Sequence, residues 1–166
     1  MRLTGAILCV AAWVAAGAGY YRNEKRRLAA LGSLSRAFSA MNAGLSLHLA
    51  AMPELLRTPS EGFAAIFLEN ASKGLEKLGE TGMERIWTDA LKACPPLLSE
   101  DEESIVRSLG GVLGACTLET QLRALSDAAA RLDERAEELR RKLPTARKLS
   151  FGLSAAFGLL TTILLM

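Results

Sequence analysis

The sequence is poor in the residue types on which most enzyme sites are built. His48 is the only histidine, so histidine-based acid–base catalysis would need a partner that the chain hardly offers. The three cysteines, Cys9, Cys94 and Cys116, have no C-x-x-C spacing, and we interpret Cys94 and Cys116 on apolar helix faces as packed free thiols. These absences argue against an enzyme, a metal centre or a bound cofactor.

Two motifs resemble catalytic signatures but have simpler structural explanations. The sequence Gly-Gly-Val-Leu-Gly at residues 110–114 lacks the Gly-Lys-Ser/Thr ending of a phosphate-binding loop and comes at a helix end instead of after a strand. We expect its glycines to permit close helix packing. The four carboxylates at residues 100–103 follow Ser99, so we expect them to lie in a capped first turn and to complement the helix dipole.

Charge is missing from both ends of the chain. The net charge of +2 is too small to create a basic field for nucleic acid. All acidic residues, and every basic residue except Arg2, lie within residues 22–148. We therefore interpret the chain as a membrane protein, with a polar domain at 22–148 between transmembrane helices at 3–21 and 149–166.

Both end stretches are long enough to cross a bilayer as helices. At a rise of ~1.5 Å per residue each reaches about 26–28 Å, close to the hydrocarbon thickness of ~30 Å. For the first stretch the alternative is a cleaved signal peptide, with Ala16-Gly17-Ala18 as its cleavage site. For the second, which is richer in large apolar side chains, the alternative is a buried core helix.

The basic residues that flank the two stretches predict their orientation. They cluster on the side of the middle domain, so the positive-inside rule places that domain in the cytoplasm and both termini outside. Two tyrosines fit an aromatic belt at the membrane interface. The predicted membrane-interface residues are Tyr20, Tyr21, Arg22, Lys25, Arg26, Arg27, Arg140, Arg141, Lys142, Arg147 and Lys148.

Helical periodicity dominates the middle domain, and no stretch of its sequence alternates as a strand would. The predicted fold class is all-α, an antiparallel bundle of about five to six helices. Its last helix carries an apolar seam with heptad spacing from Leu118 to Leu143. Its first carries a matching series from Leu28 to Met52, interrupted by Ser35 and Asn42. We expect these two helices to pair as an antiparallel stalk that continues into the spans.

Three shorter helices are expected between the stalk helices. Their amphipathic faces cover residues 63–78, 83–94 and 105–116. Capping-box patterns begin at Thr81 and Ser99, and two prolines after Cys94 should end the second of the three.

The sequence resembles the stage III sporulation protein AB family of endospore-forming bacteria. The family's aromatic-bearing helix looks like residues 87–91, and its Leu-Gly-x-x-Asp-x-x-x-Gln element looks like residues 113–121. Thr117 stands where the family has aspartate, and either residue caps a helix. The structural residues singled out by these motifs and by the seam are Trp87, Leu113, Gly114, Thr117, Gln121, Leu125 and Leu132.

The resemblance implies a non-enzymatic platform or adaptor subunit of the sporulation channel complex between mother cell and forespore. Such a subunit is similar to the inner-membrane platform component of type II secretion systems. It would lie in the mother-cell membrane around the forespore and contact other subunits of the complex, including its cytoplasmic ATPase. Two spans per chain argue against a pore built by one subunit. The sequence leaves open whether the chain forms a homo-oligomer.

Two alternatives belong to other classes of protein. One is a small membrane-anchored regulatory protein that sequesters a soluble signalling factor. The other, a ligand-binding sensor, would need an apolar pocket.

Overall fold

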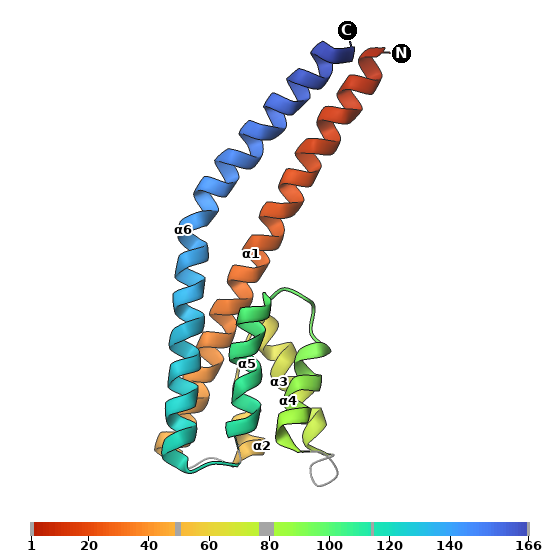
Figure 1. The fold of residues 1–166 in the computed structure, drawn as a ribbon. Coiled ribbons are helices and arrows are strands. Elements are labelled where there is room, and N and C mark those ends of the chain that lie inside the picture. Colours follow the sequence, from red (N-terminus) through yellow and green to blue (C-terminus); the bar gives the residue numbers. More distant parts are fainter. Residues whose placement is uncertain (1, 49–50, 77–81, 114, 166) are drawn as a thin grey trace. The chain divides into compact units, whose positions relative to one another are not determined.

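The computed structural model describes the backbone of residues 2–48, 51–76, 82–113 and 115–165, and the side chains of residues 15, 18–47, 51–76, 82–113 and 115–144. Within these ranges every regular element is a helix and none is a strand, which confirms the predicted all-α class. The helices are α1 (Arg2–His48), α2 (Met52–Leu55), α3 (Gly62–Leu75), α4 (Met83–Lys92), α5 (Glu100–Val112) and α6 (Leu118–Leu165) (Figure 1).

The first and last helices are much longer than the four between them. α1 has 47 residues and α6 has 48, and each connects a charge-free stretch near one end of the chain with its polar middle without a break. One sequence-based boundary was wrong, because Met52 belongs to α2 and not to the first helix. Pro53 in the first turn of α2 explains this, since proline has no backbone N–H and is tolerated only where a helix starts.

The two predicted membrane spans fall largely outside the described side chains. Within the described part of the chain, no helix has both the length and the apolar character that are needed to cross a membrane. The span predicted at 149–166 lies wholly outside the described side chains, and of the one predicted at 3–21 only residues 15 and 18–21 are included. Both spans stay predictions.

The chain forms two compact units. One combines the beginning of α1 and the end of α6, Met1–Arg26 with Glu137–Met166. The other, Arg27–Ala136, contains α2 to α5 together with the remaining parts of α1 and α6. We call this second unit the helical bundle.

The core of the helical bundle is centred on Trp87, which is fully buried. Its ring lies edge-to-face against Phe67, with 4.8 Å between centroids, and is stacked near Phe38 at 6.4 Å. Its indole Nε1 donates a hydrogen bond of 2.7 Å to the Val106 carbonyl. Side chains or backbone of α1, α3, α4 and α5 therefore meet at one aromatic residue whose polar atom is satisfied.

The apolar seam of α6 is buried over only part of its predicted length. Its buried apolar residues run from Leu125 to Ala136, whereas Leu118 at its start is 41 % exposed, so the first turn extends beyond the core. Ser35, which interrupts the apolar series of α1, is buried and donates a hydrogen bond of 3.0 Å to the Ala129 carbonyl. This bond lets a polar side chain lie inside the seam.

One of the two predicted capping boxes is present. The Ser99 side chain accepts from the Glu102 backbone N–H and the Glu102 carboxylate accepts from the Ser99 backbone N–H, so the box opens α5. The box predicted to start at Thr81 falls on a residue outside the described ranges. α4 begins at Met83 with Gly82 at its N-cap, and glycine has no side chain to accept a bond.

Gly110 allows α5 to approach Trp87 closely, and its replacement should destabilise the fold. A Cβ at Gly110 would lie 2.7 Å from the Cβ of Trp87, an atom fixed to the backbone of α4. We expect Gly110→Ala to cost about 1–3 kcal/mol of unfolding free energy, as overpacking does. The matched control is Gly111→Ala, whose Cβ would meet nothing within 4 Å. It should be neutral or stabilise by up to ~1 kcal/mol, because alanine favours helices over glycine. Denaturant unfolding of the purified chain compares the two, and equal losses would contradict the close contact.

Candidate functional site

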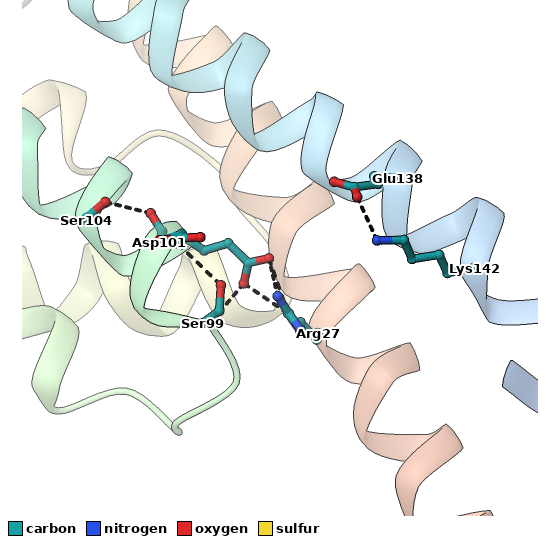
Figure 2. Close-up of polar contacts among 7 residues, drawn as sticks. Arg27, Ser99, Asp101, Ser104, Glu138 and Lys142 are labelled. Carbon is teal, nitrogen blue, oxygen red and sulfur yellow. Dashed lines mark hydrogen bonds and ion pairs between the residues drawn. The ribbon is translucent and has the colours of Figure 1, made fainter. Parts of the chain in front are cut away.

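A buried charged cluster joins α1 to the first turn of α5. Glu102 on α5 is only 2 % exposed, although carboxylates are rarely buried so far without a partner. The Arg27 guanidinium reaches both of its oxygens, with Nη2–Oε1 at 2.7 Å and Nε–Oε2 at 3.0 Å (Figure 2). A two-pronged contact of this kind fixes orientation as well as distance.

The same carboxylate also holds the end of its own helix. The Ser99 backbone N–H donates to Glu102 Oε2 at 2.8 Å, and the Ser99 hydroxyl accepts a longer bond of 3.5 Å from the Glu102 backbone. Sequence reasoning found this capping box but missed Arg27. The two charged residues lie 75 positions apart, and only the fold brings them together.

The environment of Glu102 favours its ionised form. Burial alone would raise the pKa of this carboxyl group, but hydrogen bonds from Arg27 and from Ser99 outweigh it, so the pKa lies below its ordinary value. A lowered folded-state pKa means that ionised Glu102 stabilises the fold above its unfolded-state pKa. This contribution is lost as the pH falls through the folded-state pKa.

Acidification should therefore weaken the wild-type chain more than the Glu102→Gln variant. We expect the difference in unfolding free energy between them to be constant from neutral pH down to the ordinary carboxyl pKa of 4.5, and to shrink at lower pH. Denaturant titrations at a series of pH values measure it. Glu103→Gln, at the next and more exposed position of α5, is the control. A difference that does not depend on pH would show that the Glu102 charge contributes nothing to stability.

Arg27 differs in its surroundings from the other predicted interface residues of α1. Tyr20 is 59 % exposed and Tyr21 is half-buried. Arg22, Lys25 and Arg26 are exposed, whereas the Arg27 side chain is only 27 % exposed because it binds Glu102. Its role in the fold was not foreseen from the sequence.

The predicted interface residues of α6 are exposed where their side chains are described. Arg140 and Lys142 contact carboxylates of their own helix, Glu137 at 3.3 Å and Glu138 at 2.6 Å (Figure 2 shows the second pair). Such exposed pairs contribute little to stability. Arg141 is also exposed, while the side chains of Arg147 and Lys148 lie outside the described part.

The residues singled out as structural fall into two groups. Trp87, Leu113, Leu125 and Leu132 are fully buried. The two polar residues, Thr117 and Gln121, lie at the start of α6. The Gln121 side chain donates a hydrogen bond of 2.7 Å to the Cys116 carbonyl. Thr117 directly precedes this helix and its hydroxyl lies 2.9 Å from that of Thr120. Gly114 lies outside the described residues.

The described surface of the helical bundle includes two open grooves. One, of about 250 Å³, lies between α3 and α4 and is lined by small residues such as Gly74 and Ala90, with Lys73 and Asp89 among the others. The second, of about 400 Å³, lies where α4 begins and α5 ends. Within the described ranges, no three His, Cys, Asp or Glu side chains are grouped as metal ligands would be.

The two described cysteines are free thiols with different surroundings. Cys94 is buried, as predicted, whereas Cys116 is exposed and lies between α5 and α6, so its interpretation as a packed thiol on a helix face was wrong. Burial raises the pKa of the Cys94 thiol, which keeps it protonated and unreactive at neutral pH. Cys116 is therefore the more accessible of the two to reagents in solution. The side chain of His48 lies outside the described part.

Comparison with known proteins identifies the family. The family model described as Stage III sporulation protein AB matches residues 2–166. No curated protein and no solved structure matches the chain. Because the family match covers nearly the whole length, this sporulation-related chain belongs to the stage III sporulation protein AB family.

Proposed function

We propose that this protein is a non-enzymatic membrane platform or adaptor subunit of the sporulation channel complex between mother cell and forespore. In this role it couples a cytoplasmic ATPase to membrane partners. The observation that carries the proposal is the continuity of α1 and α6, each of which runs from a charge-free end into the helical bundle. A displacement of the bundle would act directly on the two helices that anchor it.

The proposed anchors are residues 3–21 and 149–166, in the mother-cell membrane around the forespore. Both stretches lack charged side chains and are helical wherever the backbone is described. The basic residues next to them, among them Arg22, Arg26 and Arg141, are exposed and free to face anionic lipid headgroups. The helical bundle would then lie in the cytoplasm, where an ATPase can reach it.

Three buried polar side chains of the helical bundle have a structural role, which fits a subunit that acts without catalysis. Ser33 donates to the Ala30 carbonyl and accepts from the backbone N–H of Ala64, so its hydroxyl is used twice within the fold. Ser35 and Glu102 are likewise held by bonds between helices. These side chains hold the helices together.

Co-purification tests the proposal. The tagged full-length chain is produced together with the cytoplasmic ATPase of the channel complex and solubilised in detergent. We expect the ATPase to co-purify, and the chain alone to show no ATP hydrolysis. The control bait is an unrelated two-span membrane protein with the same tag. A chain that retains a soluble signalling factor and no ATPase would contradict the platform role and favour the sequestering regulator.

A further inference from the structure

The Arg27–Glu102 pair occupies positions where the helix pattern calls for apolar residues. On α1, position 27 lies in line with the buried residues three, four and seven positions later. On α5, position 102 stands in the same relation to the buried residues that follow it. These residues are Ala30, Leu31 and Leu34 on α1, and Ile105, Val106 and Leu109 on α5. A charged pair therefore lies at one end of the buried apolar series of each helix.

Stability alone does not explain this choice of residues. Removing two charges from water is costly, and buried ion pairs can often be replaced by apolar side chains without loss of stability. Such a pair adds directional hydrogen bonds, which fix the position of one helix on another. Apolar contacts are non-directional and allow one helix to shift on another. The bidentate contact between the Arg27 guanidinium and the Glu102 carboxylate fixes the orientation of the two groups.

The pair also stands at a mechanically useful place. Arg27 lies at the beginning of the part of α1 that belongs to the helical bundle. Glu102 is bonded to the Ser99 backbone, so a displacement of its carboxylate acts on the first turn of α5. The Arg27 side chain is 27 % exposed, so water can reach it if the pair opens.

We propose that the Arg27–Glu102 pair is a register-setting link that transmits the position of α1 to the first turn of α5. Its mechanical role rests on the proposed function, in which motion passes between the bundle and the membrane anchors. The link itself is a property of the folded chain and is tested without any partner.

The test measures the distance between α1 and α5 in the full-length chain in detergent. Spin labels are placed on cysteines at two exposed positions, Ala29→Cys on α1 and Ser104→Cys on α5, after the native cysteines have been replaced. We expect one narrow distance distribution for the otherwise wild-type chain. The double variant Arg27→Met/Glu102→Met should melt at or above the wild-type temperature, yet give a broadened or split distribution.

Two further variants keep the test decisive. Arg27→Lys retains the charge but loses the two-pronged contact, so we expect cooperative melting with a broadened distribution. Glu103→Gln/Arg107→Gln removes the exposed ion pair one turn along α5 and should change neither measurement. A narrow distribution in both the double variant and Arg27→Lys would overturn the link, because apolar packing would then set the register.

The outcome is separable from that of the proposed function. A broadened distribution in Arg27→Lys supports the link whether or not the wild-type chain retains the ATPase. Loss of the ATPase from the wild-type chain overturns the platform role and leaves the distance measurement unaffected.

Discussion

Replacing Trp87 with alanine should cost about 3–5 kcal/mol of unfolding free energy, the usual loss for a large aromatic residue removed from a core. The ring is fully buried and contacts Phe38 of α1 and Phe67 of α3, so its removal leaves a cavity where several helices meet. Single domains are stable by only ~5–15 kcal/mol, so the variant should melt at a much lower temperature or lose cooperative melting. Thermal unfolding followed by circular dichroism measures it.

Two controls separate the cavity from the lost hydrogen bond. Trp87→Phe keeps much of the aromatic ring but removes the 2.7 Å hydrogen bond to the Val106 carbonyl, which should cost about 0.5–1.5 kcal/mol. Ile66→Ala removes an apolar side chain that is 44 % exposed and should change stability by about 0.5 kcal/mol or less. Equal melting temperatures for Trp87→Ala and Ile66→Ala would show that the aromatic cluster is not the core.

Leu132→Ala should have the second largest effect, because this side chain lies in the middle of the buried part of the α6 seam. Leu132 is fully buried, and leucine-to-alanine changes in cores cost roughly 2–5 kcal/mol. Arg131→Ala changes the neighbouring residue on the exposed face and should stay within ~0.5 kcal/mol. Melting curves of the two variants make the comparison.

The contrast between these neighbours tests the seam and not general fragility. Equal melting temperatures would show that the seam is not part of the core, and the pairing of α1 with α6 would have to be rejected. A Leu132→Ala chain that kept its fold but no longer bound the ATPase would instead indicate that the seam faces a partner.

Local patterns explain how much of this fold could be predicted. The 3.6-residue periodicity of apolar residues is a strong signal in long helices, so the all-α class followed from the sequence. The box at Ser99 was recognisable because both of its residues lie within one turn. The seam predicted which face of α6 is buried but not how far, since the exposure of Leu118 depends on where the neighbouring helices end.

Contacts between distant residues could not be predicted in the same way. Arg27 belongs to a basic run that follows a charge-free stretch, and such a run indicates a membrane interface. The basic run itself does not distinguish Arg27 from Arg26, which is exposed, because the partner of Arg27 is Glu102, 75 positions away. The signal that could have found it was the periodic pattern itself, which places Arg27 in line with the apolar residues of α1.

Labelling of Cys116 tests most directly the central claim, that two membrane anchors carry a cytoplasmic helical bundle. Cys116 is exposed and Cys94 is buried, so in a chain that carries Cys9→Ser a membrane-impermeant maleimide should report on Cys116, and the further change Cys116→Ser should leave little signal. The chain is produced in cells from which sealed right-side-out and inverted membrane vesicles are prepared. We expect rapid labelling in inverted vesicles, and labelling of right-side-out vesicles only after permeabilisation. Labelling of Cys116 in intact right-side-out vesicles, or recovery of the chain outside the membrane fraction, would contradict the account.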